Sequence, residues 1–453
     1  MTTPLPRRED LADRLAAALA RTGVPGASIG VRAGDEVVTA AAGTTRLDAD
    51  GVPVTPGTLF LVGSVTKLWT AALVLQLAEQ GALALDDRLA DRIPEPFAVE
   101  DPRAREVTLR QLLSHTSGLA AEAAVPPERG DGAVAAATAS PAVRDLPTVA
   151  AAGQLHSYSN VGYNLLGRAV EVAAGSTWDA ALATRLAAPL GLRQTATLPE
   201  DVLLHRAALG HLPDAADDGG LTPVAAWSAP RGDGPCGGTL ATSVADLLTF
   251  ARAVTRPGLL LSQASVAAMC TPAVALPPGH GVPAWGLGWA IASPADPLVL
   301  WHGGNTNGQH STLWVLPEHD LAVAVLTNGG RTHEVREGLA AQLLDELAGY
   351  ASPMVGTPAG EGPPDPQAVA GVYASPGVRV EVRPDGQGSV GIDVATSGEL
   401  ALETPSFAAP LEAAGGDVYL LPGAGRRPAV TFVRDGNRVT HLYFGYRAFP
   451  RIG

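Results

Sequence analysis

A proline- and glycine-rich stretch divides this sequence of 453 residues into two parts of different character. Residues Ala351 to Pro366 contain five prolines, at positions 353, 358, 363, 364 and 366, together with several glycines. Proline removes a backbone N–H and fixes φ, so this composition is typical of a linker and disfavours a helix or a central strand. We therefore predict a large domain at residues 1–350, a linker at 351–366 and a small domain at 367–453.

The larger part predicts an α+β fold with a helical insertion. Apolar runs at Ala27–Arg32 and Glu36–Ala42 flank a turn, which is the pattern of a β-hairpin. Strands are also predicted near the other end, at Leu298–Trp301, Ser311–Leu316 and Leu321–Leu326. Helical apolar spacing predicts helices at Glu9–Arg21, Ser64–Gln80, Ala104–Leu113, Val161–Ala174, Ser243–Val254 and Glu334–Leu347. We expect one antiparallel sheet built from both ends of this part and flanked by helices.

The smaller part reads as β structure throughout. Short strands are predicted at Val378–Arg383, Val418–Leu421 and Ala429–Val433, each followed by a turn that contains glycine. We predict a small all-β domain there.

Charge and apolar runs exclude some partners. The chain has 31 Lys and Arg against 45 Asp and Glu, a formal net charge of -14, with no basic block that could follow a phosphate backbone or an anionic lipid surface. No run reaches the roughly 18 apolar residues of a membrane-spanning helix, and the residues after Met1 lack the pattern of a secretory signal. We expect no nucleic-acid partner, no membrane partner and a cytoplasmic location.

The sequence Gly63-Ser64-Val65-Thr66-Lys67 opens a predicted helix and contains a candidate nucleophile. Residues three apart share one helix face, so the amine of Lys67 can reach the hydroxyl of Ser64. A lysine removed from water beside a serine can help to take the hydroxyl proton. Ser-x-x-Lys is common on helices, and a capping serine with a solvated lysine would explain it equally well.

Two further motifs support the catalytic interpretation. In His156-Ser157-Tyr158-Ser159-Asn160, Tyr158 could shuttle a proton between Ser64 and the leaving group, and Asn160 could bind Lys67 and a substrate amide. In His302-Gly303-Gly304-Asn305, Gly303 and Gly304 would let substrate backbone approach as an added strand. The N–H groups of Ser64 and Asn305 would then form an oxyanion hole.

Together these motifs resemble the penicillin-binding-protein and class C β-lactamase superfamily of serine hydrolases, over roughly residues 20–345. Leu112–Leu119 and Trp285–Trp289 are also similar to stretches of that family. The resemblance implies a β-lactamase/transpeptidase-like domain. It assigns the roles of nucleophile, lysine, tyrosine and asparagine to Ser64, Lys67, Tyr158 and Asn160.

One departure from the family concerns substrate class. His302 stands where β-lactamases and most DD-peptidases of the family carry a lysine. An imidazole that is largely neutral near pH 7 replaces the cation that would bind a carboxylate. Esterases, D-aminopeptidases and thioesterases of the superfamily commonly have histidine there, so β-lactamase and DD-carboxypeptidase activities rank lower.

A catalytic domain followed by a lipocalin-like β-barrel resembles the penicillin-binding-protein-type thioesterases of nonribosomal peptide synthesis. That resemblance implies that Ser64 takes a peptidyl group with a C-terminal D-residue from a carrier-protein thioester. The peptide's own amine would then release it as a macrocycle. Arg447, on the predicted last strand, would reach the site and bind substrate. No cofactor or metal is expected, since Cys236 and Cys270 stand outside any metal-binding spacing.

Other interpretations stay open. A cytoplasmic esterase or a D-amino-acid-specific peptidase or amidase would carry the same motifs, and a non-catalytic ligand-binding protein ranks last because Lys67 and Tyr158 are both present. A Ser-His-Asp triad through His115 or His156 is disfavoured, because no Gly-x-Ser-x-Gly elbow surrounds Ser64. Five tryptophans could line an apolar pocket or belong to the core, namely Trp69, Trp227, Trp285, Trp289 and Trp314.

Overall fold

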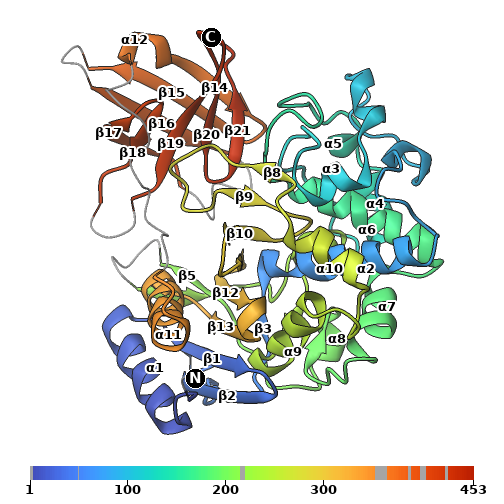
Figure 1. Cartoon of the computed structure of the whole chain (residues 1–453), viewed down its shortest axis with the longest axis vertical. Coiled ribbons are helices and arrows are strands. Elements are labelled where there is room, and N and C mark those ends of the chain that lie inside the picture. The colour runs from blue at the N-terminus through green and yellow to red at the C-terminus, as the bar shows by residue number, and fades with distance from the viewer. Residues whose placement is uncertain are drawn as a thin grey trace.

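Strands from both ends of the larger part form one eight-stranded antiparallel sheet in the computed structural model (Figure 1). The order is β2-β1-β13-β12-β11-β10-β9-β8, and β1 pairs with β13 in a register that places Ala27 opposite Thr327. The strands are β1 (Gly26–Ala33), β2 (Glu36–Gly43), β8 (Val274–Ala275), β9 (Ala284–Trp285), β10 (Ala290–Ser293), β11 (Val299–Thr306), β12 (Gln309–Leu316) and β13 (Leu321–Thr327). The predicted α+β architecture, with a sheet from both ends, is confirmed.

The structure describes residues 4–48, 50–214, 220–351, 365–385, 389–397, 405–423 and 427–453. Most of the predicted linker at 351–366 therefore lies outside the described residues, and the boundaries given to the two domains stay predictions. Within the described residues, the small domain begins with α12 (Pro366–Val369).

Both faces of the sheet are covered, because the central strand β13 is apolar on both sides. Val323 and Val325 pack in one cluster with the helices α1 (Arg8–Thr22) and α11 (Leu339–Ala348). The alternate residue Leu326 packs in a second cluster with α9 (Val244–Thr255). Successive strand residues point to opposite faces, so an unbroken apolar run serves two cores.

The helical insertion lies between β2 and β8 in sequence and covers the second face. Its helices are α2 (Thr66–Glu79), α3 (Leu109–Leu113), α4 (Ala133–Thr138), α5 (Pro141–Arg144), α6 (Asn160–Ala174), α7 (Trp178–Leu182), α8 (Pro199–Val202), α9 and α10 (Gln263–Cys270). Two small sheets also occur there. One has three strands in the order β3 (Phe60–Leu61), β7 (Ala241–Thr242), β4 (Thr195–Ala196), and the other pairs β5 (His211–Pro213) with β6 (Leu221–Pro223).

Two predicted helices differ from the structure. The helix expected at Ala104–Leu113 is broken into a 3₁₀ helix, Pro102–Glu106, and α3, because Thr108 forms a capping box with Gln111 and starts a new helix. The helix expected at Glu334–Leu347 begins with a π-helical turn, Glu334–Gly338, before α11. Apolar spacing alone does not reveal such a cap or a widened turn.

The small domain is a nearly closed β-barrel. Its strands are β14 (Gly371–Ser375), β15 (Val378–Pro384), β16 (Val390–Thr396), β17 (Phe407–Gly415), β18 (Val418–Leu420), β19 (Ala429–Asp435), β20 (Arg438–Phe444) and β21 (Arg447–Pro450). Neighbours in sequence are neighbours in the sheet. The first and last strands also meet, since the N–H of Val372 donates to the carbonyl of Gly453 at 3.1 Å and Tyr373 bridges to Arg451. The predicted all-β domain is confirmed.

The barrel docks on the edge of the larger domain near β8 and β9 (Figure 1). Thr431 donates to the carbonyl of Pro278 at 2.8 Å, and Nε2 of His441 lies 2.8 Å from the carbonyl of Val149. These contacts join β19 and β20 to loops of the larger domain, so the turn between β20 and β21 faces the catalytic motifs.

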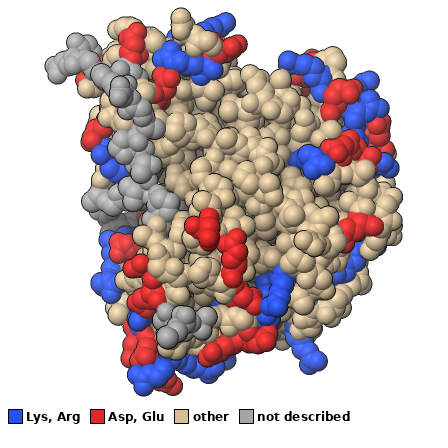
Figure 2. Space-filling view, viewed as in Figure 1, with Lys and Arg blue, Asp and Glu red and all other residues tan. Residues whose placement is uncertain are grey.

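The outer surface shows no concentration of one charge on the face seen in Figure 2. Blue and red side chains are interspersed along its outline, and its centre is largely uncharged. Among the described residues, none of the helices combines the length and apolar character needed to cross a bilayer.

Candidate active site

Ser64 lies on a short 3₁₀ turn, Gly63–Val65, immediately before α2. Gly63 has a φ of 53°, in the left-handed region that favours glycine. A Cβ on Gly63 would lie 2.6 Å from the backbone nitrogen of Asn305, so a side chain there would push β11 away. The turn therefore holds Ser64 against the strand that carries the third motif.

Lys67 is fully buried, and three groups surround its amine. Nζ lies 3.2 Å from Oγ of Ser64, 2.6 Å from Oδ1 of Asn160 and 2.5 Å from the carbonyl oxygen of Cys236. A protonated amine has three donors, so these contacts use its full capacity. Lys67 is the single lysine of the whole chain. All the other residues in the count of Lys and Arg are arginines, and an arginine does not give up its proton in proteins.

Tyr158 and Asn160 approach Lys67 from the segment that starts α6. Oγ of Ser159 caps this helix by accepting from the N–H of Gly162 at 3.0 Å, which fixes the two flanking side chains. Nζ of Lys67 lies 4.8 Å from the centre of the Tyr158 ring. The Tyr158 hydroxyl is buried and has no hydrogen-bond partner among the described residues. This hydroxyl can therefore still form a hydrogen bond with a bound group.

Strand β11 places the third motif beside Ser64. A Cβ on Gly304 would lie 1.9 Å from the carbonyl oxygen of Val62 and 3.0 Å from the backbone nitrogen of Ser64. Only glycine permits such an approach between the strand and the turn that holds Ser64. The backbone nitrogens of Ser64 and Asn305 are the two predicted oxyanion donors. Both therefore lie where β11 meets the turn that holds Ser64.

His302 is buried and neutral. Burial lowers the pKa of His302 to about 3, with a further contribution from the charge of Lys67. Its Nδ1 lies 2.8 Å from the carbonyl of Gly303, while Nε2 has no hydrogen-bond partner among the described residues. The third motif therefore supplies a neutral imidazole at pH 7, as the sequence predicts.

Aromatic side chains hold Tyr158 in place. The His115 ring stacks on Tyr158 with centroids 4.2 Å apart, and Trp285 meets it edge-on at 5.8 Å. Burial lowers the pKa of His115 well below its ordinary value, so the ring packs as a neutral group. His156 faces the barrel instead, with Nδ1 2.8 Å from the hydroxyl of Tyr443. Among the described residues, neither histidine makes the hydrogen bond to Ser64 that a triad requires.

Of the five tryptophans, one backs the site. Trp285 packs against Tyr158, whereas Trp69, Trp289 and Trp314 are fully buried core residues and Trp227 is half-buried. Trp285 is itself buried, so it belongs to the core and also packs against the site.

Arg447 reaches the site from the first residue of β21. Its guanidinium donates to Oε1 of Glu122 at 2.6 Å, and its Cζ lies 5.7 Å from the centre of the Tyr158 ring. Both oxygens of Glu122 accept in turn from the amide nitrogen of Asn160, at 2.9 and 3.0 Å. A continuous set of contacts therefore runs from Ser64 to the barrel.

Sequence reasoning missed Glu122, because no motif contains it. It also missed the role of the Cys236 carbonyl, which accepts from Lys67. Burial raises the pKa of the Cys236 thiol well above its ordinary range, so this cysteine is no thiolate nucleophile. The single lysine is a signal that a composition count could have provided.

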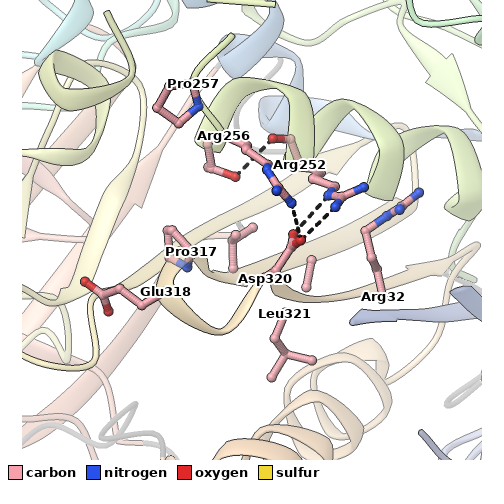
Figure 3. A pocket seen from close by; sticks show the side chains of 11 residues that line it. Arg32, Arg252, Arg256, Pro257, Pro317, Glu318, Asp320 and Leu321 are labelled. Carbon is pink, nitrogen blue, oxygen red and sulfur yellow. Dashed lines mark hydrogen bonds and ion pairs between the residues drawn. The ribbon is translucent and has the colours of Figure 1, made fainter. Parts of the chain in front are cut away.

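A separate cavity of about 390 Å³ lies between the end of α9 and the turn from β12 to β13 (Figure 3). Arg252 and Arg256 converge on Asp320 there, with distances of 2.8 and 2.7 Å. These charges pair with one another, and no motif residue lines the cavity. We interpret this cluster as a link between α9 and the turn.

Comparisons with known proteins agree with this geometry. A family model described as Beta-lactamase matches residues 11–348. Penicillin-binding protein 4 of Amycolatopsis lactamdurans is 39% identical over 371 residues, which cover 78% of this chain and 94% of that protein.

Two solved structures extend the comparison. The structure of SurE aligns with a TM-score of 0.77 at 28% identity, covering 98% of this chain and 99% of that one, and SurE has also been solved with D-Leu. D-stereospecific amidohydrolase from Streptomyces sp. aligns with a TM-score of 0.58 at 26% identity, covering 76% of this chain and 100% of that one. The SurE alignment spans the barrel as well as the larger domain.

Proposed function

This chain belongs to the beta-lactamase family, which includes the penicillin-binding proteins, and from that premise we propose that it is a thioesterase that closes peptide rings. Ser64 would accept a peptidyl group whose C-terminal residue has the D configuration. The peptide's own N-terminal amine would then release the product by head-to-tail macrocyclisation, as in nonribosomal peptide biosynthesis.

The observation that carries the proposal is the 3.2 Å contact between Ser64 and the buried Lys67. Ser64 Oγ attacks the thioester carbonyl, the C–S bond breaks, and the thiol leaves with the proton that Oγ gave up. The amine then attacks the new ester, the C–O bond to Ser64 breaks, and a proton returns to Oγ. Lys67 and Tyr158 would move both protons.

Stereochemical preference is supported by the names of two relatives. SurE was solved with D-Leu, and the Streptomyces relative is named a D-stereospecific amidohydrolase. Arg447 would bind the peptide near its reacting end, since its guanidinium lies within 5.7 Å of the Tyr158 ring centre. Gly303, Gly304 and Asn305 would accept the peptide as a strand added to β11.

The neutral side chain of His302 favours a substrate whose acyl group carries no negative charge beside it. A buried imidazole whose pKa is lowered to about 3 stays neutral at pH 7 and offers no cation to the carboxylate of a β-lactam. We therefore expect the protein to be a poor β-lactamase and a poor DD-carboxypeptidase.

The proposal includes a partner and a location. A thioester of this kind is carried by a carrier-protein domain, which would deliver the peptide to Ser64. Such thioesters are made in the cytoplasm, so the location expected from the sequence remains part of the proposal.

A second candidate is a hydrolase that uses water in place of the amine. The likeness to the D-stereospecific amidohydrolase favours a D-amino-acid-specific peptidase or amidase, with an esterase of the same family as its variant. The two candidates share Ser64 and differ only in what attacks the acyl-enzyme.

Product analysis separates the candidates. A linear peptidyl N-acetylcysteamine thioester ending in a D-residue is incubated with the protein, alongside its L epimer and the Ser64→Ala variant. A product lighter than the linear acid by one water, formed from the D epimer alone, supports the cyclase. If the D epimer yields only linear acid, the cyclase proposal fails and the hydrolase stands.

The nucleophile is tested separately with a covalent serine probe. A fluorophosphonate should label Ser64 in the wild-type protein and leave Ser64→Ala unlabelled. Lys67→Ala and Tyr158→Phe should each slow turnover by about 10²-fold or more, since each removes a proton carrier. Wild-type rates in either variant would remove that residue from the mechanism.

A further inference from the structure

Glu122 links the catalytic lysine to the barrel through Asn160. It follows the Leu112–Leu119 stretch and belongs to none of the sequence motifs. Its two oxygens accept from Nδ2 of Asn160 at 2.9 and 3.0 Å, and Oε1 also accepts from Arg447 at 2.6 Å. At its other end, Asn160 accepts from Lys67 at 2.6 Å.

The chemistry of a carboxylate decides which way the Asn160 amide points. An amide has a donor end and an acceptor end, and an ionised carboxylate can only accept. Glu122 therefore requires Nδ2 to face it, and this requirement turns Oδ1 toward Lys67. Without the carboxylate, the amide could rotate and present its NH₂ group to the amine, which would repel it.

Arg447 holds Glu122 from the opposite domain. The pair is 325 residues apart in sequence, and the two side chains are 28% and 33% exposed. An ion pair this accessible to water adds little to stability. Its consequence is geometric, because it fixes the carboxylate that orients Asn160.

We propose that Glu122 is a positioning residue for acyl-enzyme formation, and that Arg447 makes the barrel part of this arrangement. The order of action is Arg447 to Glu122 to Asn160 to Lys67, which lies 3.2 Å from Ser64. The inference rests on the proposed role of Ser64 as nucleophile. It holds whether water or an amine completes the reaction.

Backbone bonds from the barrel support the same segment. The N–H of Tyr158 donates to the carbonyl of Tyr446 at 2.9 Å, and the N–H of Ala448 donates to Oγ of Ser157 at 3.1 Å. The residues on either side of Arg447 therefore fix the chain that carries Asn160. The guanidinium and the amide are held in register by the same turn.

The test measures the rate at which an uncharged fluorophosphonate phosphonylates Ser64 in the full chain, with loss of fluoride. Glu122→Leu keeps the size of the side chain and removes both acceptors, and Glu122→Gln restores one acceptor oxygen. We expect phosphonylation to slow by about 10- to 100-fold in Glu122→Leu, the cost of a misplaced catalytic group, and to recover in part in Glu122→Gln. The exposed Glu128→Leu serves as the matched control and should keep the wild-type rate.

A double-mutant cycle tests the order of action. If Arg447 acts through Glu122, the Glu122→Leu/Arg447→Leu protein should be no slower than Glu122→Leu alone. If the rate reductions of the two single variants multiply in the double variant, Arg447 acts on the probe or on Tyr158 directly. That result would overturn the part of the proposal that involves the barrel.

The single lysine provides a second readout. Protein labelled with ¹³C only in lysine gives one Cε resonance, that of Lys67. Glu122→Leu should shift this resonance and Glu128→Leu should not. An unchanged resonance with a wild-type phosphonylation rate would overturn the proposal, and Glu122→Gln decides if Glu122→Leu fails to fold. A wild-type protein that is not labelled at Ser64 would instead refute the proposed nucleophile, and this inference would fall with it.

Discussion

The backbone N–H of Tyr158 donates a 2.9 Å hydrogen bond to the carbonyl of Tyr446, in the turn that joins the last two strands of the barrel. A residue of the catalytic motif is thus fixed by the other domain. One residue earlier, Ser157 accepts from the buried Ala448 at 3.1 Å. The docking of the barrel therefore also determines the geometry of the site.

Ser157→Ala should weaken this docking. It leaves the buried N–H of Ala448 without its acceptor, which costs about 1–3 kcal/mol of unfolding free energy. Urea denaturation followed by circular dichroism measures the loss. Ser176→Ala, at an exposed serine, should change the unfolding free energy little. Equal stability of the two variants would show that water replaces the lost contact.

Gly304→Ala should disable the site. The added Cβ would lie 1.9 Å from the carbonyl of Val62, so β11 must move away from Ser64. A displacement of about 1 Å at reacting groups can slow a reaction by about 10²-fold, and ester hydrolysis under steady-state conditions measures it.

The matched control is Gly338→Ala, where an added Cβ meets nothing within 4 Å and φ is -66°. It should keep full activity and gain up to about 1 kcal/mol, because alanine restricts the unfolded chain. Full activity in Gly304→Ala would mean that the strand and the turn that holds Ser64 need not touch.

Acid should destabilise the protein through His302. The pKa of this side chain falls from its ordinary 6.5 to about 3 in the folded protein because burial excludes the charged form. Between these values the unfolded chain holds the extra proton, so stability falls as pH decreases, by about 1.4 kcal/mol per pH unit. The loss begins below pH 6.5 and ends near pH 3.

Urea denaturation at several values between pH 7 and pH 4.5 checks this dependence. His302→Gln should lose less stability on acidification than the wild-type protein. The slope of its unfolding free energy against pH should be smaller by the contribution of about one proton. His319→Gln, at an exposed histidine, should follow the wild-type curve. Parallel curves for all three proteins would show that His302 titrates alike in the folded and unfolded chains.

Cys236 should resist alkylation although its carbonyl contacts Lys67. Burial raises the pKa of this thiol, so little thiolate forms near neutral pH. N-ethylmaleimide at pH 7.5 should leave Cys236 unmodified in the native protein and modify it in urea, as peptide mass mapping would show. A rapid adduct at Cys236 in the native protein would contradict the buried thiol.

The local parts of the site could be predicted from the sequence. A three-residue spacing places Ser64 and Lys67 on one turn, whatever the rest of the chain does, since the helix repeat is local. Apolar periodicity likewise predicted the terminal strands, α6 and the β structure of the tail. Thr108, which starts α3 and breaks a predicted helix, was missed because capping competes with apolar spacing.

What only the tertiary structure decided is which distant residues surround that turn. Packing brings Glu122 to Asn160 and the Cys236 carbonyl to Lys67. It also stacks the His115 ring on Tyr158. Arg447 meets Glu122 across 325 residues of sequence. Spacing encodes neighbours within one helix or strand, but contacts between elements depend on how their faces pack, and no local pattern records that.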